Sequence, residues 1–158
     1  MVSLSDRAVK LLRRTPVRTF ILYPLITVAW EFILKKEEFR PEFIFLPLML
    51  WGFLQYRLCG VYRTKYGGGG PGLEGAPDRL VSSGPYAYTR NPMYLGHIIF
   101  LVGLTLTLDS FLAAFITIFT TVWFHFRILG DEKNLTERLG QPYTGYLSRV
   151  KRWIPSCF

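Results

Sequence analysis

Residues 93–126 read MYLGHIIFLVGLTLTLDSFLAAFITIFTTVWFHF, which is two apolar stretches joined by Asp109 and Ser110. Asp109 is the only aspartate, glutamate, lysine or arginine in this part of the chain. A helix of a soluble bundle keeps a polar outer face, and neither stretch offers one. Because the core of a bilayer gives charges and free backbone groups no water to bind, the pattern predicts two membrane helices with a tight antiparallel turn between them.

Two more apolar stretches precede this hairpin, at residues 19–34 and 43–58. Each of the four stretches has about 16 residues, or roughly 24 Å of helix, whereas the hydrocarbon core is roughly 30 Å thick. A buried soluble helix is therefore the alternative for any one stretch, although flanking aromatic and basic side chains can extend a span to the interface. Together the stretches predict an all-α integral membrane protein with about four transmembrane helices.

Basic residues flank the apolar stretches, in a chain of formal net charge +8. This placement favours an anionic membrane surface over nucleic acid as the partner. Residues 1–18 mix basic and apolar side chains, which predicts an interfacial helix. By the positive-inside rule both termini and the loop after the second stretch lie in the cytoplasm. The membrane is expected to be either the bacterial inner membrane or that of the endoplasmic reticulum. The sequence leaves the oligomeric state open.

Two features argue against a nucleotide fold and against a metal site. The run from Gly67 to Gly70, with Gly72 after it, contains GxGxxG spacing. No strand pattern precedes it and no helix pattern opens from it, so a flexible linker is favoured over a dinucleotide site. Cys59 and Cys157 form neither a disulfide framework nor a zinc pattern, and we predict no metal site.

Two polar clusters flank the hairpin: residues 80–96 read LVSSGPYAYTRNPMYLG and residues 131–146 read DEKNLTERLGQPYTGY. Because the hairpin is antiparallel, both clusters emerge at the same face of the membrane. Pro92 suits the first turn of a helix, where its missing N–H is no loss. If a helix begins just before Pro92, three side chains fall on one stripe, namely Arg90, Tyr94 and His97.

These clusters resemble the C-terminal half of the isoprenylcysteine carboxyl methyltransferase family and its phospholipid methyltransferase relatives. In that family LVxxGxYxxxRHPxYxG is followed, after one helical hairpin, by EExxLxxxFGxxYxxYxxxVxxxIP. The resemblance covers residues 78–155. It implies an integral-membrane methyltransferase that uses S-adenosylmethionine and releases S-adenosylhomocysteine. The acceptor it implies is an amphiphile from the bilayer, such as a prenylated cysteine carboxylate, a lipid amine or a similar small molecule.

The resemblance also implies which residues form the site. For cofactor binding, the two motifs select Asp78, Arg79, Leu80, Val81, Tyr86, Asn91, Pro92, Met93, Tyr94, Asp131 and Glu132. The family's arginine upstream of the acidic pair, near the acceptor, matches Arg127, so Arg127 and Glu132 are the expected catalytic residues. The helical stripe adds Arg90 and His97 to the cofactor-binding set.

The residue types at these positions suit the chemistry of the cofactor. The carboxylates of Asp131 and Glu132 suit a sulfonium cation, and the ring of Tyr94 suits the adenine. Arg90 and Asn91 can donate hydrogen bonds to the carboxylate of the amino-acid tail. Methyl transfer mainly needs alignment and exclusion of water, so few side chains have to move protons.

The sequence departs from the family pattern at three positions. Asn91 replaces a histidine, Asp131 replaces a glutamate and Leu139 replaces a phenylalanine. The loss of a titratable group at Asn91 motivates an alternative, a non-catalytic membrane scaffold or lipid-binding protein with the same fold. A membrane reductase that binds a nicotinamide nucleotide is a third hypothesis. Arg127 could also be a snorkelling anchor, and His97 an interhelical hydrogen-bonding residue.

We therefore expect a single domain over residues 1–158. Its expected parts are an interfacial helix (1–18), a first helical hairpin (19–58), a loop covering the cofactor (59–92), a second helical hairpin (93–126) and a C-terminal cofactor-binding segment (127–158).

Overall fold

The computed structural model describes residues 14–36, 39–70, 72–73 and 75–153. Helices are the only regular elements in these ranges. The first three, α2 (Thr15–Val17), η1 (Arg18–Leu22) and α3 (Tyr23–Lys35), run on without a break and are called the N-terminal helix below. The others are η3 (Phe43–Phe45), α4 (Leu46–Gly67), α5 (Pro85–Tyr88), α6 (Pro92–Leu108), α7 (Phe111–Leu139) and α8 (Gln141–Arg149).

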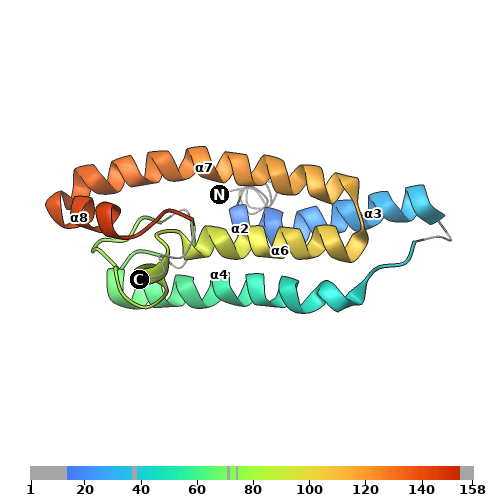
Figure 1. Cartoon of the computed structure of the whole chain (residues 1–158), viewed down its shortest axis with the longest axis horizontal. Helices are drawn as coiled ribbons and strands as arrows, with labels where there is room; N and C mark the ends of the chain where they lie inside the picture. The colour runs from blue at the N-terminus through green and yellow to red at the C-terminus, as the bar shows by residue number, and fades with distance from the viewer. Residues whose placement is uncertain (1–13, 37–38, 71, 74, 154–158) are drawn as a thin grey trace, which may run out of the picture.

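The long helices lie side by side along the longest axis of the molecule, with α6 in the middle (Figure 1). Most residues of α6 are buried, from Pro92 to Leu108. Glycines allow α4 to lie directly against it. A Cβ on Gly96 would be 2.7 Å from the carbonyl oxygen of Gly52 and 2.8 Å from the amide nitrogen of Tyr56. Small residues thus allow the close backbone approach that is typical of membrane helix pairs.

The turn between α6 and α7 forms where the sequence predicts it. Asp109 adopts the left-handed conformation, with φ of 43°. Ser110 caps α7 by accepting a hydrogen bond from the amide of Ala113 at 3.1 Å. The hydroxyl of Ser110 also donates to the buried carboxylate of Glu31, 2.6 Å away. Lys35 pairs with Glu31 at 3.1 Å and donates to the carbonyl of Asp109, which ties the N-terminal helix to the turn.

Three helices are long and apolar enough to cross a membrane: Thr15–Lys35, Phe43–Gly67 and Phe111–Leu139. Large apolar side chains on these helices face outward, among them Leu25, Phe32, Ile44, Leu58, Phe115 and Phe119. The fourth apolar helix, α6, is 17 residues long and mostly covered by its neighbours. The fold is therefore that of an all-α membrane protein.

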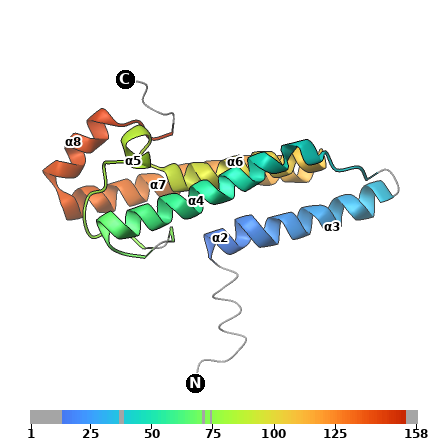
Figure 2. The same cartoon turned by 90° about the horizontal axis from the view of Figure 1, so that it is seen from below.

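Two helices extend well past the predicted apolar stretches. The helix expected to end at residue 58 continues to Gly67, and the one expected to end at residue 126 continues to Leu139. No proline interrupts either extension, so the helices persist until a glycine with positive φ follows, Gly68 or Gly140. These extensions form the end of the bundle that carries α5 and α8 (Figure 2).

The first predicted segment also has different bounds. Residues 15–18 are already part of the N-terminal helix. Residues 1–13, which were expected to form most of an interfacial helix, lie outside the described residues.

Candidate functional site

A polar cavity of about 80 Å³ lies at the end of the bundle where α4 ends and α6 begins. Helices α4, α6, α7 and α8 contribute to its wall, as does the segment between α4 and α6. The lining residues are Arg63, Leu73, Pro77, Leu80, Val81, Tyr86, Arg90, Asn91, Tyr94, Asp131, Glu132, Leu135, Leu139, Tyr143 and Tyr146. The two polar clusters of the sequence therefore meet around one cavity.

Glu132 is the buried acidic centre of this cavity, with 7% of its surface exposed. The Arg152 guanidinium contacts both carboxylate oxygens, with Nη2 2.7 Å from Oε2 and Nε 3.2 Å from Oε1. Arg90 approaches the same carboxylate, with Nη2 3.3 Å from Oε1. The hydrogen bond to Glu132 raises the pKa of Arg152 above its ordinary value. Two guanidinium groups share one carboxylate, which leaves a surplus of positive charge beside the cavity.

Asp131 precedes Glu132 on α7 but has a different partner. The hydroxyl of Tyr94 donates a hydrogen bond to Oδ2 of Asp131 at 2.7 Å. This contact joins the start of α6 to the polar half of α7. It places both carboxylates and the Tyr94 ring on one cavity wall.

Three further tyrosines form the aromatic part of the wall. The hydroxyl of Tyr146 donates to the carbonyl of Tyr86 at 2.6 Å, and the hydroxyl of Tyr86 donates to the carbonyl of Cys59 at 3.3 Å. Burial raises the pKa of Tyr143 to about 12 and also raises the pKa of Tyr86 and of Tyr146. All three phenols therefore stay protonated at neutral pH, and those of Tyr86 and Tyr146 serve as neutral donors.

Arg90 and Asn91 hold the segment after α8 against the start of α6. The guanidinium of Arg90 donates to the carbonyl of Leu147 at 3.2 Å. The backbone amide of Arg90 donates to the carbonyl of Lys151 at 3.0 Å. The side-chain amide of Asn91 donates to the carbonyl of Arg152 at 3.3 Å. Donors that we expected to face a ligand carboxylate are thus engaged by backbone, and in this way they position Arg152.

The structure brings eight of the predicted cofactor-binding residues together on the cavity wall: Leu80, Val81, Tyr86, Arg90, Asn91, Tyr94, Asp131 and Glu132. It places four others elsewhere. Asp78 and Arg79 are exposed, because the Asp78 carboxylate turns back to accept from the amide of Gly69 at 3.0 Å. Pro92 and Met93 are buried in the helix packing, where the Pro92 carbonyl accepts a hydrogen bond from Gln55.

His97 and Arg127 also lie outside the cavity wall. Helix α6 begins at Pro92, so Arg90 precedes it and does not share the predicted stripe with His97. His97 instead lies deeper in the bundle. Arg127 donates to the hydroxyl of Thr15 at 2.9 Å and to the carbonyl of Leu73 at 3.1 Å, so it links three separate segments.

Sequence reasoning did not assign Arg152 to the site, nor seven of the lining residues: Arg63, Leu73, Pro77, Leu135, Leu139, Tyr143 and Tyr146. Leu73 belongs to the segment interpreted as a flexible linker, yet it is 7% exposed and packs in the core with Val81 and Phe124. Arg63 holds this segment by donating to the carbonyls of three glycines, Gly70, Gly72 and Gly75. An arginine close before a glycine run was the available signal for this arrangement.

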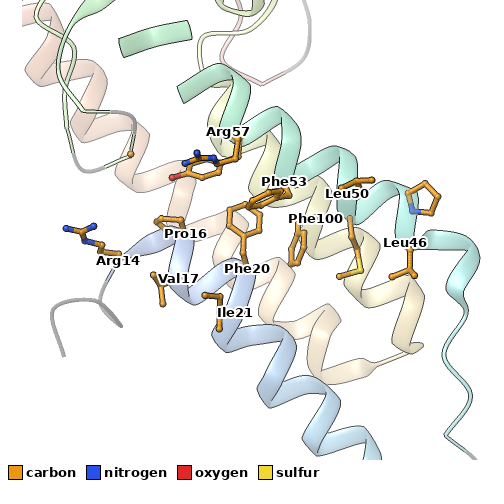
Figure 3. Close-up of a pocket in the computed structure, with 14 residues that line it drawn as sticks. Arg14, Pro16, Val17, Phe20, Ile21, Leu46, Leu50, Phe53, Arg57 and Phe100 are labelled. Carbon is orange, nitrogen blue, oxygen red and sulfur yellow. The ribbon is translucent and has the colours of Figure 1, made fainter. Parts of the chain in front are cut away.

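A second, larger cavity is an apolar groove of about 1100 Å³ between the N-terminal helix and α4 (Figure 3). Its walls are mainly aromatic and aliphatic, with Phe20, Phe53 and Phe100 at the centre and Arg14 and Arg57 among the lining residues. Gly72 also lines this groove, whereas the next residue, Leu73, lines the polar cavity. One segment of chain therefore lies between the two cavities.

Comparisons with known proteins give consistent results. A relative in Schizosaccharomyces pombe, a protein-S-isoprenylcysteine O-methyltransferase, is 34% identical over 79 residues. The match covers 48% of this chain and 33% of the relative, so the chain aligns with about a third of that protein's length. No solved structure matches the chain. This relative and the family model that matches the chain are both named for methyltransferases, and neither favours the alternative of a non-catalytic scaffold. The family model for phospholipid methyltransferase matches residues 46–140, and the chain belongs to this family of membrane proteins.

Proposed function

We propose that this protein transfers a methyl group from S-adenosylmethionine to an amphiphilic acceptor that enters from the bilayer, and releases S-adenosylhomocysteine. The observation that carries the proposal is the pair of cavities. A small polar cavity with carboxylates, guanidinium groups and tyrosines lies next to a large apolar groove, and Gly72 and Leu73 lie between them.

The residues of the polar cavity fit S-adenosylmethionine. Asp131, which accepts from the neutral hydroxyl of Tyr94, is the carboxylate that suits the sulfonium charge, and the Tyr86 ring offers an apolar surface to the adenine. Arg90 and Arg152 supply the positive charge that a tail carboxylate needs. When bound, S-adenosylmethionine would supply an electrophilic methyl group, and the chain's part is to hold and align it.

The cavity has to enlarge to take such a ligand. Its volume of about 80 Å³ is well below the roughly 300–1,000 Å³ of typical small-molecule pockets. Leu73 lies outside the helices and lines the cavity, so its displacement would open the polar cavity toward the groove. This opening would admit the ligand, and the return of Leu73 would exclude water.

The apolar groove suits the tail of a lipid-like acceptor. Its lining is dominated by apolar side chains, and Arg14 and Arg57 could contact an anionic part of the head group. The acceptor carries either a prenylated cysteine carboxylate, a lipid amine or a similar small group. For a carboxylate, Arg127 would orient the acceptor from its place beside Leu73. For an amine, the acidic pair of α7 could accept the proton.

The positive-inside rule supports a cytoplasmic location for the polar cavity. The segments that surround it carry Arg63, Arg90, Lys133 and Arg152. The opposite end of the bundle pairs Lys35 with Glu31 and has Asp109 at the turn. Four membrane crossings, with α6 as the short central one, satisfy this arrangement. A soluble cofactor would then reach its site from the cytoplasm.

Calorimetry with S-adenosylhomocysteine tests the cofactor, and transfer of a radiolabelled methyl group into lipid and prenylcysteine extracts tests the reaction. We expect binding heat and label incorporation by the purified protein, with both lost in Glu132→Ala. Glu137→Ala is the matched control, because Glu137 lies on the same helix but is exposed and does not line the cavity. Absence of binding heat from the unmodified protein would overturn the proposal.

A further inference from the structure

His97 lies between the apolar groove and the polar cavity. On the groove side its ring stacks on Phe20 and contacts Tyr56, with both ring centroids 4.6 Å away. Both of these residues line the groove. On the other side it contacts Phe124 at 5.6 Å, and Phe124 contacts Tyr94, which lines the polar cavity. One side chain therefore separates the imidazole from the groove, and two side chains, Phe124 and Tyr94, separate it from the polar cavity.

The imidazole is also a buried polar group without a partner. His97 is 0% exposed, and neither ring nitrogen has a hydrogen-bond partner in the described part of the chain. Leaving such a group unpaired costs about 1–3 kcal/mol. Two buried side chains elsewhere in the bundle are satisfied, since Thr27 donates to the carbonyl of Tyr23 and Glu31 accepts from Ser110. The buried hydroxyl of Thr19 is also unpaired in the described part of the chain, but His97 is the side chain with both of its polar atoms unpaired. An exception of this kind calls for a specific explanation.

We propose that His97 is the hydrogen-bond partner of the acceptor's head group, at the inner end of the apolar groove. This inference rests on the proposed methyl-transfer function and adds a residue of the acceptor site to it. The ring of Phe20 covers the imidazole from the groove, at an interplanar angle of 24°. Phe20 is only partly buried, so a change of its rotamer uncovers His97 without moving a helix.

The position of His97 also defines a preference among acceptors. A neutral imidazole has one N–H donor and one acceptor nitrogen. A neutral amine or a hydroxyl carries both a lone pair and a proton, so it can pair with either nitrogen. A carboxylate has no proton to donate, so it can pair only with the protonated ring nitrogen. The imidazole can therefore pair with an amine or a hydroxyl whichever of its nitrogens faces the groove, but with a carboxylate only through its N–H.

Nitrogen-15 NMR of the imidazoles tests this binding directly. The chain has two histidines, and His125→Gln assigns their signals. We expect dodecylamine, added in detergent with S-adenosylhomocysteine bound, to shift the His97 ring nitrogens while those of His125 stay in place. His97 signals that stay unchanged at saturating dodecylamine overturn the inference.

A substitution separates this role from a structural one. His97→Phe keeps an aromatic ring in the stack and removes the unpaired nitrogens, so the melting temperature should stay the same or rise. Binding of S-adenosylhomocysteine should be unchanged, while methyl transfer falls roughly 10- to 100-fold, as expected for one lost hydrogen bond to the acceptor. His125→Phe is the control, because His125 lines neither cavity.

The outcomes distinguish the two proposals. If His97→Phe lowers the melting temperature and abolishes binding of S-adenosylhomocysteine, His97 has a structural role and the inference is wrong. Retention of activity within threefold would also overturn it. If the unmodified protein binds no S-adenosylhomocysteine, the proposed function itself fails and the assignment of His97 falls with it.

Discussion

Glu31 and Glu132 are buried carboxylates near opposite ends of α6, and the contrast between them identifies the site. They are 3% and 7% exposed, and each is paired with a basic side chain. Glu31 is satisfied by Lys35 and by the hydroxyl of Ser110. Glu132 is held by Arg152 and Arg90 and lines the polar cavity, whereas Glu31 lines neither the polar cavity nor the apolar groove.

A buried ion pair is therefore a weak sign of function by itself. Around Glu31 one carboxylate meets one ammonium group, and the pair ties the N-terminal helix to the α6–α7 turn. Around Glu132 one carboxylate meets two guanidinium groups beside open space. A ligand with a negatively charged group can balance this excess of positive charge next to the cavity.

The largest expected effect is that of Glu132→Gln on cofactor binding. This change keeps the shape of the side chain but leaves Arg90 and Arg152 without their shared carboxylate. Removing one partner of a buried charge pair costs about 2–5 kcal/mol, so the affinity for S-adenosylhomocysteine should fall roughly 30-fold or more. Calorimetry measures the affinity, and a change below threefold would contradict the assignment of Glu132 to the site. Glu137→Gln is the control.

Leu73→Ala should lower stability while sparing the cofactor. Leu73 fills buried space between the two cavities, and Leu to Ala changes in cores cost about 2–5 kcal/mol. We expect the lower end of this range, because a loop can relax. If Leu73 closes the cavity, the affinity for S-adenosylhomocysteine should stay equal or increase. Denaturant unfolding and calorimetry on the same sample check both, and a tenfold loss of affinity would show instead that Leu73 holds the ligand.

Glu31→Gln should behave in the opposite way to Glu132→Gln. It leaves Lys35 without its ion pair, and the free energy of unfolding should fall by about 1–3 kcal/mol. Affinity for S-adenosylhomocysteine should be unchanged, because Glu31 is remote from the polar cavity. Thermal unfolding in detergent measures the first effect. A loss of affinity larger than threefold in the folded protein would remove the distinction between the two glutamates.

The smallest expected effect is that of Arg152→Lys. A lysine keeps the charge but cannot contact both carboxylate oxygens of Glu132 as Arg152 does. Because Arg152 is partly exposed, we expect about 1 kcal/mol, or roughly a fivefold loss of affinity. Arg138→Lys is the control, since its contact with Asp78 is exposed and 3.9 Å long. Equal effects of the two changes would contradict a special role for Arg152.

Much of the site followed from motif positions, and the remainder depended on contacts between distant segments. The hairpin at Asp109 and Ser110 places Tyr94 beside Asp131 as expected, with a hydrogen bond of 2.7 Å. The exposure of Asp78 was not predictable, because it results from the local path of the glycine-rich segment. Nor was the position of His97, since the start of α6 at Pro92 leaves Arg90 outside the helix.

The sequence by itself determined the helical class, the turn at Asp109 and the common end of the two polar clusters, because hydropathy and turn chemistry act over a few neighbouring residues. Only the tertiary structure decided which partner each charged side chain takes. Arg152 reaches Glu132, and Arg127 reaches Thr15, far away in the sequence. Such choices depend on how each helix is rotated and how closely α4 and α6 approach, and those are set by packing across the whole bundle.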